Sequence, residues 1–362
     1  MSNRRTFLKQ LGSGSLAAGA ALSFPSIWLP KKKEKLGVAL VGLGYYSTDV
    51  LAPALQLAQH CELKGIVTGS PHKIPIWQEK YGIQDRNVYN YETMSEVANN
   101  EEIDVVYIVL PPALHRTYSV IAAEAGKEVW CEKPMAPTVA DCQAMIDAAK
   151  ANKVSLSIGY RLHHEPNTQT VMRYAKEQPF GKIQKVHAEA AYFDGRSNHW
   201  KQNKELGGGS MYDMGVYPLN AIRYATGEEP IAVRSAKHST KRPEIYTEVD
   251  ETTHFELEFA SGAEASGITS FGMRLNELRV DCAEGWYELV PFQGYSGVKG
   301  RTSDGTLLNQ TIPNQQTKQM DDDALRIKAG KTALVPGEEG LLDIRVVEAI
   351  YASAAKGGRV EL

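Results

Sequence analysis

Residues 104–134 constrain the fold more than any other part of this 362-residue chain. Residues 105–110 form an apolar run rich in β-branched side chains and too short for a helix core, so they predict a buried strand. Two prolines end this run, residues 114–125 follow with helical spacing, and Gly126 stands where a glycine would end that helix. A second strand, residues 129–131, then leads into Lys133. The stretch predicts a βαβ unit with a lysine at the carboxyl edge of a parallel sheet, where ligands of open α/β sheets bind.

Similar alternation of strands and helices surrounds this unit, and the pattern changes near residue 160. The length has room for about two domains. Beyond residue 160, stretches of period two between glycine-containing turns predict a largely antiparallel sheet. We therefore expect an α/β protein: a doubly wound parallel sheet of the Rossmann type over residues 31–158, then an α+β domain over residues 159–362. The second domain would contain a large, mostly antiparallel open sheet and a C-terminal helix over residues 338–356.

The overall composition excludes several function classes. The formal net charge is −3 with 23% charged residues, which argues against a nucleic-acid binder. The four cysteines are scattered with no pair at C-x-x-C spacing, so a zinc site or a dense disulfide framework is not expected. We predict no metal site.

The first thirty residues have the features of a cleavable export signal. A basic start, a mild apolar run over residues 11–24 and small residues near Ala18 fit such a signal better than a membrane span. The paired arginines Arg4 and Arg5, followed by Phe-Leu-Lys, are typical of a twin-arginine signal. An ordinary basic tail is the alternative. We predict export of the folded protein to the periplasm.

A glycine-rich turn follows the first predicted strand, residues 36–41, and precedes a helix predicted over residues 48–59. In this context the turn is typical of a dinucleotide-binding site, because Gly42 permits the tight turn and Gly44 lets the backbone approach a pyrophosphate at the helix N-terminus. Ser47 takes the third position, where Gly or Ala is usual, and is small enough for close packing. Tyr45 and Tyr46 lie within the same turn and complete this group of cofactor-binding candidates.

The end of the second predicted strand, residues 63–67, favours NADP over NAD. An enzyme that prefers NAD usually places an acidic residue here to bind the ribose 2′-hydroxyl, and none occurs between residues 65 and 76. Thr68, Gly69, Ser70 and Lys73 instead offer hydroxyls, a flexible turn and positive charge, which suit a 2′-phosphate. Lys73 could also be a solvated residue of the helix start.

The loop after the strand at residues 105–110 would reach the ribose and nicotinamide side of the cofactor. Leu110, Pro111 and His115 are the candidates there, although His115 could equally be a capping or surface residue. Glu132, which precedes Lys133, and Arg161, which follows the last strand of the first half, complete the cofactor-side candidates.

Residues 200–220 provide the remaining candidate catalytic groups. The glycines at positions 207–209 permit close approach of the backbone to a ligand, and a helix interrupted by Pro218 is expected over residues 210–224. On a helix, Asp213 and Tyr217 share one face. A carboxylate and a phenol aimed at Lys133 would form a proton-transfer site. A buried Asp and Tyr that satisfy each other are the structural alternative.

Several motifs together resemble the glucose–fructose oxidoreductase/inositol dehydrogenase/MocA (GFO/IDH/MocA) family, and the exported glucose–fructose oxidoreductase subgroup most of all. They span nearly all of the chain after the signal: GLGYYS, VLPPALH, AGKEVWCEKP, GYRLHHEP, GGGSMYDMGVYPLN and DIRVVEAIYASAAKGG. The resemblance implies a Rossmann domain, a second domain whose open sheet forms homodimers or homotetramers, and hydride transfer between nicotinamide and a carbinol carbon of a sugar or polyol.

The resemblance also implies roles for individual residues. Lys133 would orient the reacting hydroxyl and assist proton transfer, Tyr217 would act as acid–base, and Asp213 would position Tyr217 or the substrate. Arg161 would contact cofactor or substrate. Most of the wider family has histidine where Tyr217 stands, and Ala113 replaces the usual asparagine. A tyrosine has a pKa near 10, so an adjacent cation such as Lys133 is needed to lower it toward working pH.

Other functions remain compatible with these residues. A glycosidase that uses transient oxidation by a bound nicotinamide would cleave glycosides with no net change in cofactor. A non-catalytic sugar- or nucleotide-binding module could use the same fold. An oxidoreductase could either exchange its cofactor or retain it and cycle it between two sugars, and the sequence leaves the sugar undefined.

Overall fold

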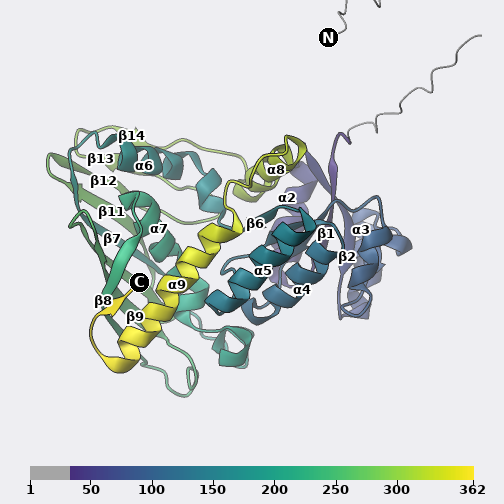
Figure 1. Ribbon diagram of the computed structural model, residues 1–362, viewed down its shortest axis with the longest axis horizontal. Coiled ribbons are helices and arrows are strands. Elements are labelled where there is room, and N and C mark those ends of the chain that lie inside the picture. The colour runs from purple at the N-terminus through teal and green to yellow at the C-terminus, as the bar shows by residue number, and fades with distance from the viewer. Residues whose placement is uncertain (1–32) are drawn as a thin grey trace, which may run out of the picture. The chain divides into compact units, whose positions relative to one another are not determined.

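The computed structural model describes residues 33–362, and residues 35–362 form one compact unit (Figure 1). The predicted export signal, residues 1–30, lies outside the described residues. In the part of the chain that is described, no helix is both long enough and apolar enough to cross a membrane.

The first sheet, within residues 33–362, has six parallel strands in the order β3-β2-β1-β4-β5-β6. The strand order reverses between β1 and β4, which is the switch point where such sheets bind ligands. Both strands are buried along their whole length, as expected for a parallel sheet covered on both faces. The strands are β1 (Leu36–Val41), β2 (Cys61–Val67), β3 (Val88–Tyr89), β4 (Val105–Ile108), β5 (Glu128–Cys131) and β6 (Leu156–Ile158).

Helices connect these strands, because parallel neighbours need crossover connections. This arrangement confirms the predicted doubly wound parallel sheet. The connecting elements are η1 (Tyr46–Leu51), α2 (Ala52–Leu57), η2 (Pro71–Lys73), α3 (Ile74–Tyr81), η3 (Asp85–Asn87), η4 (Met94–Asn99), α4 (Pro112–Glu124) and α5 (Val139–Asn152).

The second sheet has nine strands in the described chain, in the order β14-β13-β12-β11-β7-β10-β9-β8-β15. Only the β7–β10 pair is parallel, so the predicted mostly antiparallel sheet is confirmed. The strands are β7 (Ile183–Ala191), β8 (Pro230–Ser239), β9 (Thr252–Phe259), β10 (Glu264–Ser270), β11 (Leu275–Cys282), β12 (Gly285–Leu289), β13 (Gly300–Thr302), β14 (Leu307–Leu308) and β15 (Val360–Glu361).

Helices of the second half lie against one side of this sheet, with α7 on β7 and α9 on β8 (Figure 1). The predicted helix over residues 210–224 is a π-helical turn, η8, followed by α7. Pro218 is the third residue of α7, directly after the π-helical turn. The helical elements of this half are η5 (Arg161–His164), α6 (Pro166–Glu177), η6 (Trp200–Gln202), η7 (Lys204–Leu206), η8 (Met211–Gly215), α7 (Val216–Thr226), α8 (Gln315–Lys328) and α9 (Gly337–Lys356).

Helix α8 packs on the first sheet, although it comes from the last fifty residues of the chain. Its Met320 and Ala324 belong to the same apolar core as β1 and α2. The Asp321 carboxylate accepts hydrogen bonds from the backbone N–H groups of Gln59 and His60, at 3.0 and 2.7 Å. The residue pattern predicts no helix here, and the reason is visible in the structure: much of the buried face of α8 is polar.

Candidate active site

Strand β5 delivers Lys133 to the carboxyl edge of the first sheet, as the βαβ pattern predicts. Its Nζ donates a hydrogen bond to the backbone oxygen of Asp213 at 2.6 Å and lies 3.7 Å from Asp213 Oδ1. The same ammonium lies 4.7 Å from the centroid of the Tyr217 ring. The structure therefore brings the three predicted catalytic residues together, two from η8–α7 and one from the end of β5.

The surroundings of Lys133 keep it positively charged. Burial by itself disfavours the ammonium, but the neighbouring Tyr217, Asp213 and Glu132 outweigh this effect, so the pKa of Lys133 is raised above its ordinary value. Only 12% of the side chain is exposed. A buried, persistent cation at this place acts through its charge and its hydrogen bonds.

Asp213 is held as a carboxylate by two lysines. Besides Lys133, the ammonium of Lys201 donates to Asp213 Oδ2 at 2.7 Å, and the Tyr192 hydroxyl donates to the same oxygen at 3.1 Å. Burial would raise the pKa of Asp213, but the charges of Lys201 and Lys133 and the two hydrogen bonds hold it below its ordinary value. Among the described residues, Oδ1 accepts no hydrogen bond, and Lys133 Nζ lies 3.7 Å from it. The structural alternative of a closed Asp–Tyr pair is wrong, because Asp213 pairs with the lysines.

Arg161 is the second cation beside Tyr217. Its guanidinium carbon lies 5.5 Å from the centroid of the Tyr217 ring and 5.1 Å from that of Tyr295. Nη1 donates to the Gln315 side-chain oxygen at 2.5 Å and to the Gly294 carbonyl at 3.0 Å. Only 2% of Arg161 is exposed. The residue links the end of the first sheet to the β12–β13 loop and to α8.

Three buried glutamines of α8 face this site, and the sequence argument gave them no role. They connect the helix to the glycine-rich turn, to Arg161 and to the carboxyl ends of β4 and β5. The Tyr107 hydroxyl in turn donates to Glu132 at 2.7 Å, and burial raises the pKa of Glu132. The contacts are Gln315 with Arg161, Gln316 with the Tyr46 hydroxyl at 3.4 Å, and Gln319 with the Tyr107 hydroxyl at 3.4 Å.

The glycine-rich turn has the geometry that a dinucleotide requires. Gly42 has a φ of +89°, and a Cβ there would lie 2.5 Å from the Val109 carbonyl oxygen, so only glycine fits. No atom lies within 4 Å of the place where a Gly44 Cβ would stand, which leaves the backbone open to a ligand. The buried Ser47 hydroxyl donates to the Gly42 carbonyl at 2.5 Å. Ser47 therefore fits inside the turn at the position where glycine or alanine is usual.

The two tyrosines of this turn differ in position. Tyr45 is 68% exposed. Tyr46 is half-buried, and its ring centroid lies 5.9 Å from that of Tyr295. Because Tyr295 also contacts Arg161, a continuous row of aromatic and cationic side chains joins the glycine-rich turn to Lys133.

The end of β2 folds toward the glycine-rich turn. Lys73 Nζ donates to the Leu43 carbonyl within that turn at 2.6 Å, so Lys73 is not simply a solvated residue. Thr68 Oγ1 accepts a hydrogen bond from the Ser70 N–H at 3.0 Å. Between them Gly69 has little room for a side chain, because a neighbouring tyrosine ring lies 2.9 Å from its Cβ position. Thr68, Gly69, Ser70 and Lys73 therefore form a second turn, which lies beside the glycine-rich turn.

His115 is neither a cofactor contact nor a capping or surface residue, the two alternatives that the sequence leaves open. The side chain is fully buried, with Nδ1 3.0 Å from the Pro134 carbonyl and Nε2 2.8 Å from the Leu110 carbonyl. Burial lowers its pKa. The ring has no exposed atom for a nucleotide, so the predicted direct contact is wrong and His115 instead fixes the loop after β4 against the loop after β5. Leu110 and Pro111 are half-buried at the edge of the same loop.

Two family models match the chain: "Oxidoreductase family, NAD-binding Rossmann fold" over residues 36–160 and "GFO/IDH/MocA C-terminal domain" over residues 168–288. The crystal structure of an aldose–aldose oxidoreductase from Caulobacter crescentus, complexed with glycerol, superposes with a TM-score of 0.87. It is 39% identical and the match covers 91% of this chain and 100% of that chain. The chain belongs to the GFO/IDH/MocA family.

Other members of the GFO/IDH/MocA family are similar over nearly the whole length. The NADP-dependent D-xylose 1-dehydrogenase of Haloarcula marismortui is 28% identical over 338 residues, covering 90% of this chain and 92% of that protein. The D-glucoside 3-dehydrogenase of Escherichia coli is 26% identical, covering 90% of this chain and 97% of that protein. The resemblance predicted from the motifs is confirmed at the level of the family.

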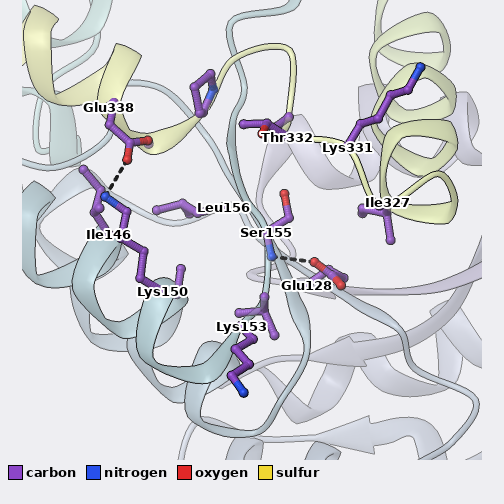
Figure 2. A pocket seen from close by; sticks show the side chains of 16 residues that line it. Glu128, Ile146, Lys150, Lys153, Ser155, Leu156, Ile327, Lys331, Thr332 and Glu338 are labelled. Atoms are coloured by element: carbon purple, nitrogen blue, oxygen red, sulfur yellow. Dashed lines mark hydrogen bonds and ion pairs between the residues drawn. The ribbon is translucent and has the colours of Figure 1, made fainter. Parts of the chain in front are cut away.

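A separate cavity of about 350 Å³ lies at the amino ends of strands β5 and β6, away from the carboxyl edge that carries Lys133 (Figure 2). It is lined by the beginnings of β5 and β6, including Glu128 and Ser155, and by the segment between α8 and α9. The Ser155 N–H donates to the Glu128 carboxylate at 2.6 Å, as Figure 2 shows. None of the candidate site residues lines it. In residues 33–362, no group of three or more His, Cys, Asp or Glu side chains is arranged to hold a metal ion.

Sequence reasoning missed Lys201, Tyr192 and Tyr295 in addition to the glutamines of α8. Lys201 carried the clearest signal, because it is a lysine beside Trp200, a few residues before the glycines at 207–209. Tyr192 directly follows the end of β7, and Tyr295 lies in the loop between β12 and β13. Their contacts depend on how the two sheets pack, which the local pattern does not encode.

Proposed function

We propose that this member of the family is an oxidoreductase that transfers a hydride between a nicotinamide cofactor and a carbinol carbon of a sugar or polyol. The observation that carries the proposal is the cluster of Lys133, Asp213 and Tyr217 at the carboxyl edge of the first sheet, joined to the glycine-rich turn by Arg161 and Tyr295. Family members that act on xylose, glucosides and aldoses support a sugar as substrate.

The residues present fit a dinucleotide. The open backbone at Gly44 and the positive φ of Gly42 provide the close approach that a pyrophosphate needs. Glu132 and Arg161 lie where the cofactor would meet the second half of the chain. When bound, the nicotinamide ring supplies the hydride acceptor or donor.

The protein's own residues would handle the proton and the orientation. A substrate hydroxyl can donate a hydrogen bond to the open Oδ1 of Asp213, which points its carbinol group toward Lys133. The Lys133 ammonium stabilises the negative charge that develops on the alcohol oxygen as the hydride leaves. Tyr217, beside that ammonium, is the group proposed to take or return the hydroxyl proton. Asp213 stays ionised and fixes the substrate.

The experiment that tests this proposal measures nicotinamide absorbance of the purified, folded protein with a panel of aldoses, ketoses, polyols and glycosides. We expect reduction of the nicotinamide with at least one free sugar or polyol, either with retained or with added cofactor. Glycoside cleavage with no net change in cofactor would contradict the proposal, and so would the absence of any reaction across the panel.

We further propose NADP as the preferred cofactor. The support is the turn of Thr68, Ser70 and Lys73, which has donors and a cation but no acidic residue, and the NADP specificity in the name of the Haloarcula marismortui relative. Lys73→Ala should weaken NADP binding about tenfold, an effect of one lost charge-assisted hydrogen bond, and leave NAD binding nearly unchanged. Equal weakening of both would contradict NADP preference. The neighbouring variant His72→Ala is the control, because His72 is exposed on the same turn.

Export and assembly are also proposals. The twin-arginine pattern at residues 4–9 supports export to the periplasm, to be tested by fractionation of cells with Arg4→Lys/Arg5→Lys as the control. The second sheet has helices against one side, which leaves the other available for a homodimer or homotetramer. Light scattering of the purified protein measures its mass directly, and a monomer at micromolar concentration would contradict assembly.

A further inference from the structure

We propose that Lys201 is a positioning residue for Asp213: it holds one carboxylate oxygen so that the other stays open toward Lys133 and the reacting hydroxyl. The part that concerns substrate rests on the proposed function. The part that concerns the Asp213 carboxylate rests on geometry alone and is tested separately.

The two carboxylate oxygens of Asp213 have different partners. Oδ2 accepts hydrogen bonds from Lys201 Nζ at 2.7 Å and from the Tyr192 hydroxyl at 3.1 Å. Oδ1 faces Lys133 Nζ at 3.7 Å, which is beyond hydrogen-bond distance. Lys201 Nζ also donates to the Tyr192 hydroxyl at 2.9 Å, so the three groups form a closed triangle. This triangle prevents the carboxylate from rotating its second oxygen away from the site.

The side chains of both Lys201 and Asp213 are largely buried, which makes their pairing energetically important. The side chains of Lys201 and Asp213 are 19% and 9% exposed, and removing such charges from water is unfavourable unless they are paired. Lys133 already supplies one cation for this carboxylate. A second buried lysine, brought by the segment between β7 and η8, is more than charge balance requires. Its contribution is the orientation of the carboxylate.

Other charged groups near the triangle come from the same segment. The Tyr192 hydroxyl lies 3.3 Å from Asp194 Oδ2, and Asp194 forms an ion pair with Arg196 at 2.6 Å. The pKa of Asp194 is lowered to about 2: burial alone would raise it, but its hydrogen bonds and ion pair with Arg196 dominate. Arg196 also lies 3.5 Å from the Tyr192 hydroxyl and 3.2 Å from His199 Nε2, and the opposite charges of Asp194 and Arg196 offset each other at Asp213. The groups that set the charge at Asp213 are Lys201, Lys133 and Tyr192.

The first test compares Lys201→Met with Lys201→Arg and with Lys204→Met, a control lysine that is exposed on the same segment. In Lys201→Met we expect kcat to fall about tenfold to hundredfold, the effect of one lost hydrogen bond to a charged group, with a smaller change in KM. The acidic limb of the kcat/KM profile should move to higher pH, because Asp213 loses one of its two cations. Lys201→Arg should restore most of kcat. Identical kinetics for Lys201→Met and Lys204→Met would overturn the proposal.

The second test does not depend on turnover. Carboxyl carbons of aspartate labelled with carbon-13 are titrated by NMR in the full-length protein, and Asp213→Asn identifies the signal of Asp213. Lys201→Met should raise the Asp213 pKa, and Lys204→Met should leave it unchanged. An unchanged pKa in Lys201→Met would overturn the positioning role. A wild-type protein that reacts with no sugar, but whose Asp213 signal shifts in Lys201→Met, would refute the proposed function and leave this inference standing.

Discussion

The segment formed by η8 and α7 carries two buried charged clusters, one near each end, and they are built differently. At the start, Asp213 is a single carboxylate between two cations, Lys133 and Lys201. At the other end, Arg223 is a single cation among carboxylates, with Glu229, Glu339 and Asp343 as its partners. Arg223 is 3% exposed and Asp343 is not exposed at all.

The difference lies in whether the hydrogen bonds are complete. Nε and both terminal nitrogens of Arg223 donate to carboxylate oxygens, and Asn220 donates to Asp343 as well. Every side-chain nitrogen of Arg223 therefore has a carboxylate partner, and the cluster joins α7 to α9. The Asp213 cluster keeps one carboxylate oxygen without a donor among the described residues. A closed cluster of buried charge stabilises the fold, whereas an open one is suited to bind and react.

The largest effect on kcat should come from removing Lys133, one of the two cations of the open Asp213 cluster. Lys133→Ala should lower kcat about 10³- to 10⁴-fold, equivalent to about 4–5.5 kcal/mol of transition-state stabilisation, because both charge stabilisation and proton transfer depend on it. The unfolding free energy should change far less, since Asp213 keeps Lys201. Steady-state kinetics and urea unfolding measure the two effects, and full activity in Lys133→Ala would sink the catalytic assignment.

The closed cluster should show the opposite pattern. Arg223→Met should lower the unfolding free energy by about 3–5 kcal/mol, because the buried Asp343 carboxylate loses its ion-pair partner, while the folded fraction keeps most of its kcat. Glu229→Gln is the matched control: Glu229 is 51% exposed, so its loss should cost less than about 1 kcal/mol. If Arg223→Met were as stable as wild type but inactive, the distinction between the clusters would be wrong.

The two carboxylates should also give opposite pH dependence, with a smaller amplitude. Burial raises the pKa of Asp343 to about 6 despite Arg223, so its stabilising contribution is present below its unfolded pKa and is lost as pH rises through about 6. The pKa of Asp213 is lowered, so its contribution is present above the unfolded value of about 4 and is lost as pH falls below it.

Isosteric variants measure this contrast by urea unfolding at several pH values. Relative to Asp343→Asn, wild type should lose about 1–3 kcal/mol between pH 4 and 7. Relative to Asp213→Asn, it should lose stability as pH decreases from about 5 toward 2. Curves with the same sign for both variants would contradict the assignment of the two clusters.

Much of the fold was accessible from the sequence because its first half follows local rules. The strand at Leu36–Val41 was predicted with both ends correct, and the helix at Pro112–Glu124 to within two residues, since apolar periodicity and turn residues mark them. The residue pattern placed Lys133 at a strand end and the other two candidate residues on one helical face, and the family resemblance implied that the three act together. These features depend on neighbours in sequence or on a general property of parallel sheets.

The parts that were not predicted depend on packing between distant segments. Helix α8 buries Gln315, Gln316 and Gln319, so the apolar period that reveals a helix is weak there. Lys201 becomes a partner of Asp213 through the packing of the segment between β7 and η8, which the local pattern does not encode. His115 was expected at the surface or at the cofactor, yet two backbone carbonyls enclose it.

The position of α8 determines when the core of the first sheet can be completed during synthesis. Residues 36–160 leave the ribosome first, but part of their apolar core is covered by Met320 and Ala324, and the Ala54 carbonyl accepts its hydrogen bond from Thr317. The nucleotide-binding half therefore completes its own surface only after about nine-tenths of the chain has been synthesised. Its glycine-rich turn gains the Gln316 contact at the same late stage. Nascent chains that stall before residue 315 should expose an unfinished core and bind chaperones in place of cofactor.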